Sequence, residues 1–297
     1  MPRLPKILDV ESEWDATKPW MTVQERDEAV AKLVQDKGLE WTIKRLLSDW
    51  RLFSQCVFTT HDPRRTPSKL PFKLYPYQYK ILECMDWCLG HGSSLGADKS
   101  RDVGFSEVTG IWLLKHWFCD DDFQALLTNR KESMIDSLRE PDTLFERMRM
   151  KIRDVPDALK PALLPGFDAK KYQTFMRLIN PETGSTITGE APIRDFARQG
   201  RYSVIVYDEC AFMRNLQQMI VSASESSQCH FYISTPNRRN KFWRLLEDAR
   251  KNGTFPVIRV HWSEHPIKGA GLYVQQEHTL VENLRELMKK HVDNTLD

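Results

Sequence analysis

The chain of 297 residues is 41% hydrophobic and 28% charged, a composition typical of a soluble globular protein that is long enough to bury a core. It contains no apolar run of about eighteen residues and no apolar segment at its start, so we expect a cytosolic protein without a membrane partner. Its 43 Lys and Arg residues against 41 Asp and Glu residues give a net charge of +2, which indicates no nucleic-acid partner unless cations gather locally.

The cysteine and histidine spacing does not indicate a metal centre. The six cysteines include no C-x-x-C pair, so we expect reduced thiols instead of a disulfide scaffold or a zinc site. Cys84 and Cys88 are four residues apart, as are His261 and His265, but further ligands at suitable spacing are missing. Packing roles are therefore favoured for all four.

The first 70 residues predict an arm followed by helices. Residues 1–22 are polar and rich in proline, which indicates a loose extension. Thr22 and Glu25 form a capping-box pattern that opens a helix, and apolar residues continue at helical spacing to Trp50 with an interruption at Gly38. We expect two helices here, followed by a proline-rich loop over residues 61–71.

A short motif, Tyr75-Pro76-Tyr77-Gln78, precedes a predicted apolar helix. The Gln78 amide is able to accept a hydrogen bond from an adenine amino group and to donate one to a ring nitrogen, while a tyrosine offers a stacking face. The alternative interpretation is a helix start with a buried aromatic residue.

Residues 99–106 predict a phosphate-binding loop. Against the template G-x-x-x-x-G-K-[ST], Gly104 and Ser106 match, whereas Lys99 takes the place of the first glycine and Phe105 that of the lysine. Such a loop needs backbone amides at a helix start, a cation for the phosphates and a hydroxyl for Mg²⁺. Lys99 is able to reach the phosphates from the other end of the loop, so the chemistry survives the rearrangement.

The segments beside this loop give opposite indications. Residues 107–118 predict a strong helix, as the motif requires. Residues 91–98 are poor strand material, although a phosphate loop should follow a strand. Either a short strand is centred on residues 95–97 or the loop assignment is wrong.

The middle of the chain alternates predicted strands and helices. We expect a strand over 123–128, a basic helix over 129–153, a hairpin over 172–189 with its turn at 180–184, and strands over 230–233 and 255–260. Residues 270–297 predict a helix-rich tail.

An apolar strand over residues 204–207 ends in Asp208 and Glu209. It predicts a buried parallel strand that delivers both acids at its carboxyl end, where α/β proteins bind ligands. An aspartate there can hold Mg²⁺ through water, and a neighbouring glutamate can orient and deprotonate an attacking water. The alternative is an ordinary strand end with a solvated acidic pair. Together with the loop at residues 99–106, the acids make nucleotide hydrolysis the leading interpretation.

These motifs resemble the large terminase subunits of tailed bacteriophages, the ATPases that drive DNA into procapsids. Several members carry a displaced loop lysine like Lys99 with an aromatic residue like Phe105, and others have an arginine at the position of Arg101. Tyr75 to Gln78 is similar to the family's adenine-binding element, and Ser234-Thr235-Pro236-Asn237 is similar to its coupling motif. The resemblance covers residues 72–268, the ATPase half only.

The resemblance implies an α/β P-loop NTPase core with a mostly parallel sheet flanked by helices over residues 71–268. Residues 1–70 would form an arm and a lid-like helical segment, and residues 269–297 a tail or linker. The implied ligands are ATP and Mg²⁺. The implied partners are double-stranded DNA, a portal protein that carries a homo-oligomeric ring of this chain, and a small terminase subunit, all in the host cytoplasm. No second acidic cluster suited to two metals follows residue 268, so we expect no nuclease activity from these residues.

The resemblance also assigns the candidate site. Gly104 and its neighbours would cradle the phosphates, and Glu209 would activate water. An arginine before the acidic strand would act on a neighbouring subunit's nucleotide; Arg198 is our choice and Arg201 the reserve, although a solvated basic loop is the alternative. The remaining assignments are the phosphate cations Lys99 and Arg101, the loop residues Ser100 and Phe105, the Mg²⁺ ligands Ser106 and Asp208, the adenine-site residues Tyr75 and Gln78, and the coupling residues Ser234, Thr235 and Asn237.

Two other functions fit the same motifs. A helicase-like DNA-dependent ATPase would share the glutamine and the acidic pair, and a nucleotide-binding scaffold would keep an eroded loop that hydrolyses nothing. A cationic and aromatic stretch over residues 238–244 suits a phosphate backbone, or else forms a solvated helix face.

Overall fold

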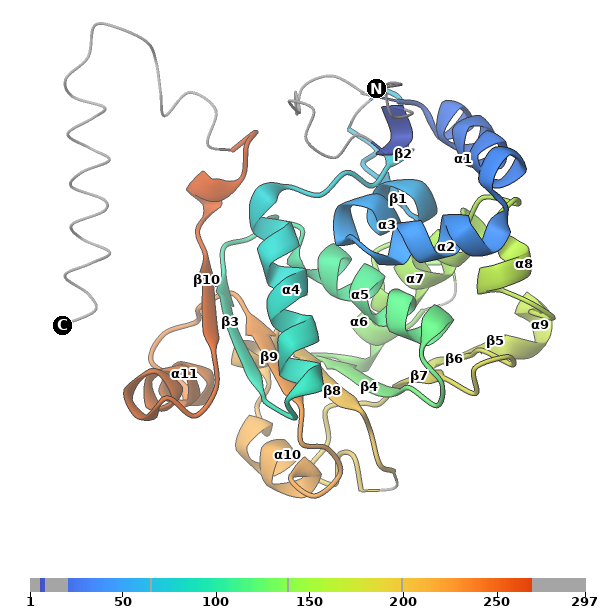
Figure 1. Ribbon diagram of the computed structural model, residues 1–297. Coiled ribbons are helices and arrows are strands. Elements are labelled where there is room, and N and C mark those ends of the chain that lie inside the picture. Colours follow the sequence, from blue (N-terminus) through green and yellow to red (C-terminus); the bar gives the residue numbers. More distant parts are fainter. Residues whose placement is uncertain (1–5, 9–20, 65, 138, 199, 269–297) are drawn as a thin grey trace, which may run out of the picture.

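The computed structural model describes residues 6–8, 21–64, 66–137, 139–198 and 200–268. Its centre is an eight-stranded sheet in the order β10-β3-β9-β8-β4-β7-β6-β5 (Figure 1). All pairings from β10 to β7 are parallel, and the last two are antiparallel. The strands are β3 (Leu95–Lys99), β4 (Gln124–Asn129), β5 (Gln173–Thr174), β6 (Arg177–Ile179), β7 (Thr186–Gly189), β8 (Val204–Asp208), β9 (His230–Ser234) and β10 (Val257–Val260). The predicted α/β fold with a mostly parallel sheet is confirmed.

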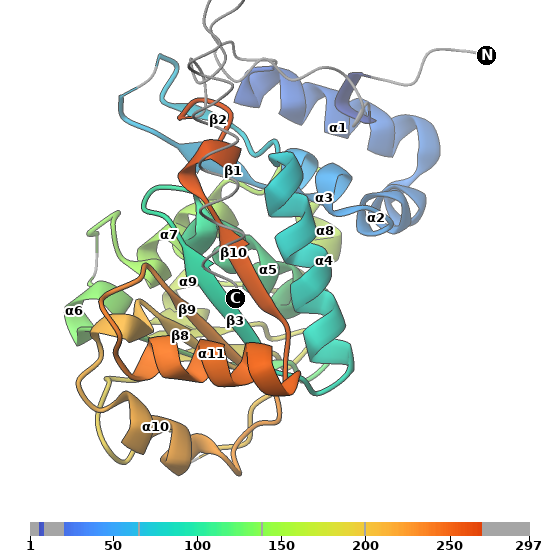
Figure 2. The ribbon, with the colours of Figure 1, turned by 90° about the vertical axis from the view of Figure 1, so that its left-hand side faces the viewer.

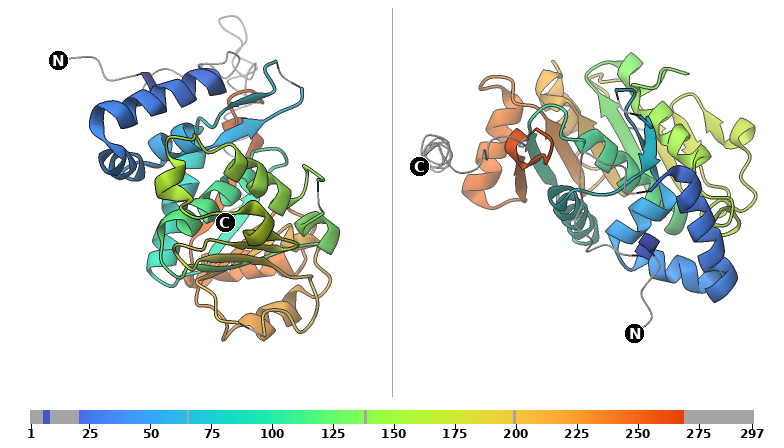
Figure 3. Two further views of the ribbon diagram at one scale, coloured as in Figure 1. Left: turned by 90° about the vertical axis from the view of Figure 1, so that its right-hand side faces the viewer. Right: turned by 90° about the horizontal axis from the view of Figure 1, so that it is seen from above.

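Helices cover both faces of this sheet (Figure 3). The helices α4 (Pro76–Gly90), α5 (Phe105–Cys119) and α7 (Leu144–Arg153) pack on one face, and α10 (Leu216–Ala223) and α11 (Lys241–Asn252) pack on the other (Figure 2). Successive side chains of β8 point to opposite faces of the sheet, so this strand contributes to the core under both helix layers. Val204 and Val206 belong to the first core, and Ile205 and Tyr207 belong to the second.

The N-terminal helices continue the first core. They are α1 (Val23–Lys37), α2 (Leu39–Leu47) and α3 (Trp50–Val57), followed by an antiparallel pair of β1 (Thr59–His61) and β2 (Lys69–Pro71). The buried guanidinium of Arg26 donates to the backbone carbonyls of Phe58 and Asp154, which ties α1 to the end of α7. The short elements are η1 (Lys6–Leu8), α6 (Glu132–Ile135), α8 (Lys160–Leu163), α9 (Ala169–Tyr172), η2 (Cys210–Phe212) and η3 (Trp262–Glu264). No helix in the described ranges is long and apolar enough to cross a bilayer.

The short strand predicted before Lys99 is confirmed as β3. Its unusual composition has a packing reason at Gly96, where a Cβ atom would overlap the side chain of Leu246 on α11. A β-branched residue would therefore push α11 off the sheet. The glycine lowers the strand propensity of β3 but allows α11 to pack close to it.

Two predictions for local structure are wrong, and a third holds only in part. Residues 129–153 form two helices, because Asp136 leaves the helical path to accept hydrogen bonds from both terminal nitrogens of Arg149, at 2.7 and 2.6 Å, and from the backbone of Met176. The N-terminal region has three helices, since Asp49 caps a new one through the Arg51 amide. The loop predicted over residues 61–71 is found at 62–64 and 66–68, whereas 61 and 69–71 belong to the β1–β2 pair. The predicted hairpin is confirmed by β6 and β7, whereas the tail predicted over residues 270–297 and most of the arm lie outside the described residues.

A buried histidine between α4 and α5 gives a prediction about stability. Both ring nitrogens of His116 face carboxylates, Asp120 at 2.6 Å and Asp86 at 3.1 Å, and Asp86 also accepts hydrogen bonds from Trp50 and Trp112. Burial alone would lower the pKa of His116, but these hydrogen bonds raise it above its usual value. The protonated ring therefore stabilises the folded chain fully below pH about 6.5, and this stabilisation disappears as the pH rises through the raised pKa.

We expect the unfolding free energy of the wild type to fall more steeply above neutral pH than that of His116→Gln. Urea unfolding of both proteins between pH 6 and pH 9 measures this difference. Parallel curves would show that folding does not raise the pKa of His116.

Candidate active site

The predicted functional residues meet at the carboxyl edge of the parallel strands. Lys99 ends β3, Asn129 ends β4, Asp208 ends β8 and Ser234 ends β9. From β3 the chain continues into α5 on one face of the sheet, and from β9 into α11 on the other face. Such a change of direction leaves a crevice at the carboxyl edge, which is where open α/β sheets bind ligands.

The loop from β3 turns into α5 at a glycine. Gly104 has φ of +72°, and a Cβ atom at this position would lie 2.7 Å from the Gln78 amide nitrogen. Helix α5 begins directly after it at Phe105. The Phe105 side chain is buried, so the aromatic residue in the usual lysine position belongs to the core. Any cation for a phosphate in this loop must come from another position.

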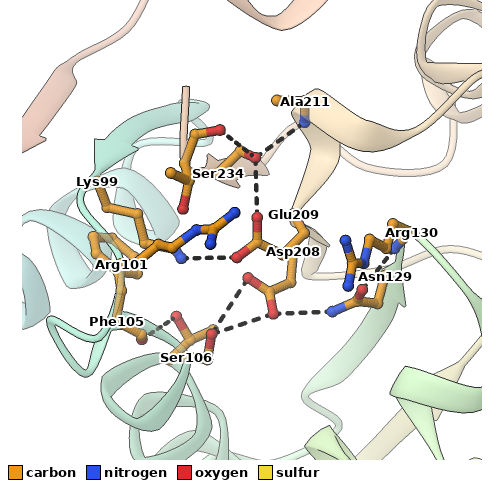
Figure 4. A network of polar contacts seen from close by, with 12 residues as sticks. Lys99, Arg101, Phe105, Ser106, Asn129, Arg130, Asp208, Glu209, Ala211 and Ser234 are labelled. Atoms are coloured by element: carbon orange, nitrogen blue, oxygen red, sulfur yellow. Dashed lines mark hydrogen bonds and ion pairs between the residues drawn. The ribbon is translucent and has the colours of Figure 1, made fainter. Parts of the chain in front are cut away.

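Lys99 and Glu209 share one site, as the sequence predicted. The Nζ atom of Lys99 lies 3.0 Å from Oε1 of Glu209, and the lysine is 6% exposed (Figure 4). Glu209 has φ of +55°, a left-handed conformation that is uncommon outside glycine. The hydroxyl of Ser234 donates to Oε2 of Glu209 at 3.3 Å and accepts from the backbone amide of Ala211 at 3.1 Å. The carboxylate of Glu209 is thus held from two sides.

Asp208 lies beside this pair in a polar cradle. The Ser106 hydroxyl donates to its carboxylate at 3.2 Å, and the Asn129 amide donates at 3.1 Å (Figure 4). Burial raises the pKa of Asp208 to about 6, with the positive charge of Lys99 acting to lower it and the negative charge of Glu209 acting to raise it. A buried carboxylate with so few donors is a position where a cation would be stabilised.

A cavity of about 380 Å³ opens beside Lys99, Ser106 and Glu209. Its size falls in the range of small-molecule sites. Besides Lys99 and Glu209, its lining includes three arginines and two residues of the predicted motifs, namely Arg101, Arg130, Arg147, Ser106 and Thr235. Arg147 is paired with Glu107 at 3.2 Å, whereas Arg130 lies over the ring of Phe212, 5.7 Å from its centroid. The lining thus contains four cations beside three acids, Asp102, Glu107 and Glu209, and cations of this kind are what a polyphosphate would require.

The sequence did not identify three of these residues. Asn129 ends β4 and Arg130 follows it, and the interpretation of residues 129–153 as one helix concealed both. A polar residue directly after a buried strand was the available signal for Asn129. Arg147 lies on α7 and reaches the cavity only through the packing of α7 beside α5.

The adenine-site residues lie beside the loop and do not line the cavity. Gln78 is 3% exposed; its side-chain oxygen accepts from the Tyr75 amide at 3.0 Å, and its nitrogen lies 3.5 Å from the Val103 carbonyl oxygen. The Tyr75 ring stacks on Tyr77 and lies 4.9 Å from the His265 ring. The Gln78 amide thus braces the loop, and its contact with a base remains a prediction.

Three further predicted residues lie in other places. Ser100 anchors its loop, because its hydroxyl accepts from the Trp262 amide at 3.1 Å. Asn237 lies in the connection from β9 to α11, outside the cavity lining. Arg198 is exposed and pairs with Asp195 at 3.0 Å. Its neighbour Ala197 accepts from Ser226, just before β9 begins, so Arg198 lies towards the opposite edge of the sheet.

No protein-family model matches this chain. Three similar solved structures are phage large terminases or their ATPase domains. A point mutant of the ATPase domain of the Thermus phage P74-26 large terminase is 15% identical with a TM-score of 0.42, over 65% of this chain and 83% of that one. The same domain without the mutation is 16% identical with a TM-score of 0.41, over 62% and 84%. The large terminase of another thermophilic bacteriophage is 11% identical with a TM-score of 0.40, over 63% of this chain and 46% of that one.

Proposed function

We propose that this chain hydrolyses ATP with Mg²⁺ and uses the energy to move double-stranded DNA, as the ATPase half of a phage large terminase. One observation carries the proposal. The displaced lysine, the loop hydroxyl and the strand-end acid Glu209 line one cavity, with Lys99 at 3.0 Å from Glu209, and the second strand-end acid, Asp208, lies 3.2 Å from the Ser106 hydroxyl. On this proposal the chain assembles as a ring on a portal protein, with a small terminase subunit, in the host cytoplasm.

The loop supplies the phosphate-binding groups. The first amides of α5 have no partner within the helix and carry its positive dipole end, which suits a bound phosphate. Lys99 and Arg101 both line the cavity and add charge. Because Lys99 pairs with Glu209 at 3.0 Å, bound phosphates would compete with that carboxylate for the lysine. Nucleotide binding therefore leaves the Glu209 carboxylate available for another partner.

The residues around Asp208 fit Mg²⁺. Its carboxylate and the Ser106 hydroxyl are hard oxygen donors of the kind that Mg²⁺ prefers, and Mg²⁺ sites commonly use one or two carboxylates together with substrate phosphates. The described residues contain no cluster of three His, Cys, Asp or Glu that would hold a metal ion by itself. When bound, the cation would neutralise charge on the phosphates.

Glu209 is the residue that would activate the attacking water. A carboxylate freed from Lys99 accepts a proton from water at the edge of the cavity, and Ser234 keeps it in place through Oε2. Ser234 also touches the backbone of the next loop, because its hydroxyl lies 3.1 Å from the Thr235 carbonyl oxygen. We infer that Ser234, Thr235 and Asn237 convey phosphate loss to α11.

Phosphate release from ATP tests this function. We expect release that requires Mg²⁺ and rises when double-stranded DNA is added to the purified chain. Release without stimulation by DNA would refute the motor, and strand separation by the chain would favour a helicase. ATP binding without any release would indicate a scaffold protein.

Arg198 gives a prediction about assembly. Because Arg198 lies away from the cavity of its own chain, it would act on a neighbouring subunit. We expect Arg198→Ala and Glu209→Gln each to be inactive alone, and their mixture to regain roughly tenfold more hydrolysis than either, since one partner supplies the intact site and the other the arginine. Rates of mixtures at several ratios measure this. A mixture that stays inactive would mean that Arg198 does not act in trans.

A further inference from the structure

We propose that the start of α11 and the loop before it bind the phosphate backbone of double-stranded DNA, and that Asn240 connects this surface to the hydrolytic site. We define the basic surface as Arg238, Arg239, Lys241, Trp243 and Arg244. The inference rests on the proposed function for its link to hydrolysis. DNA binding by the surface is independent of that link.

The cations of the basic surface are exposed and available. Arg238, Arg239, Lys241 and Arg244 are all solvent-exposed, and within the described part of the chain none of them lies within 4.0 Å of a carboxylate. In a chain of net charge +2, four unneutralised cations within seven residues form a local positive field. Exposed cations without protein partners can exchange water and counterions for phosphates at little cost.

The backbone of α11 adds to this field. Its first turn contains no acidic residue, so no side chain neutralises the positive end of the helix dipole. Asn240 caps the helix by accepting a hydrogen bond from the Trp243 amide at 3.1 Å, which leaves the amides of Lys241 and Phe242 without a partner within the helix. Helix starts of this kind contact DNA phosphates.

The surface is also held in position. The Arg239 guanidinium lies 5.3 Å from the Trp243 ring centroid, and the ring is 37% exposed. A stacked arginine loses less freedom when it meets a phosphate than a free one does. Phe242 is buried in the second core, which fixes the first turn of α11 to the sheet. The Arg239–Trp243 contact and the buried Phe242 therefore hold the first turn of α11 in place for a duplex backbone.

A short path joins this surface to Glu209. The Asn240 side-chain nitrogen donates to the Ala211 carbonyl oxygen at 2.7 Å, and the Ala211 amide donates to the Ser234 hydroxyl at 3.1 Å. That hydroxyl donates to Glu209. Two of these residues, Ala211 and Ser234, are labelled with Glu209 in Figure 4. A shift of α11 on DNA therefore moves a direct neighbour of the carboxylate.

The test compares two variants that lose the same charge. The test variant is Arg239→Gln/Lys241→Gln/Arg244→Gln, and the control is Lys32→Gln/Lys44→Gln/Lys251→Gln, whose three lysines are exposed elsewhere. Binding to a 30-base-pair duplex is measured without nucleotide at several salt concentrations. We expect the slope of log affinity against log salt to shrink by about 2.7 in the test variant, since each lost phosphate contact contributes about 0.9, and the control to match the wild type. Equal salt slopes in the test variant and the control would refute DNA binding by the basic surface.

A second comparison tests the connection. Asn240→Ser keeps a capping hydroxyl for α11 but is too short to reach Ala211. We expect this variant to bind the duplex like the wild type and to lose its stimulation of hydrolysis by DNA; retained stimulation would refute the connection. Tighter binding to single-stranded RNA, abolished in the test variant, would show that the partner is RNA and overturn the proposal. Duplex binding by a chain that hydrolyses no ATP would refute the proposed function and leave the surface intact.

Discussion

Replacing Glu209 with glutamine is expected to abolish ATP turnover and to leave ATP binding intact. The glutamine side chain has the same size and keeps an oxygen for Lys99 or Ser234, so the fold around the site is preserved. It cannot take a proton from water, and loss of a positioned general base lowers rates by about 10² to 10⁴. Single-turnover phosphate release and equilibrium binding of a fluorescent ATP analogue separate the two effects.

The matched control for this variant is Glu225→Gln. Glu225 is an exposed glutamate near the end of the α10 region, so its substitution removes the same charge at a distance from the cavity. We expect it to turn over ATP at the wild-type rate. Normal turnover by Glu209→Gln would remove Glu209 from its role. Loss of binding as well as turnover would show that its contact with Lys99 shapes the site.

The sequence was sufficient to predict that Lys99 and Glu209 lie together, because the motifs that place each of them are local. A glycine turn before a helix and two acids after an apolar strand each specify a position at the carboxyl edge of a parallel sheet. Lys99 and Glu209 then meet because β9 alone separates β3 from β8. The pairing predicted in the sequence is found in the structure, whereas the chemical roles of these residues await experiment.

The features of the site that the sequence did not predict depend on tertiary packing. Asn129 approaches Asp208 because β4 pairs with β8. The sequence of each strand alone does not predict which strand will be its neighbour in the sheet. The break at Asp136 arises because a buried carboxylate is stabilised by Arg149, thirteen residues later, more than by a continued helix. In the same way, the motif that contains Gln78 correctly predicts the start of a helix. The contact between the Gln78 side-chain amide and the loop at Gly104 depends on where the folded chain places that loop.

Lys99→Met is expected to remove the response of the chain to ATP. The substitution keeps the length of a mostly buried side chain and deletes the charge that would meet the phosphates, so binding loses its best-placed cation. A ligand present at a thousand times its Kd stabilises the folded state by about 4.1 kcal/mol, and we expect the wild type to show a clear rise in Tm with ATP and Mg²⁺. Lys99→Met should show almost none, with hydrolysis reduced about 10² to 10³-fold.

Phe105→Leu is the matched comparison, because Phe105 occupies the position where a standard phosphate loop has its lysine. Its side chain is buried in the core, so leucine lowers stability without touching the phosphates. We expect this variant to have a lower Tm but a rise with ATP equal to that of the wild type. If Phe105→Leu loses the response to ATP and Lys99→Met keeps it, the lysine is not the phosphate cation. The Lys99–Glu209 pair would then be a structural ion pair, and the displaced-lysine loop would be wrongly aligned.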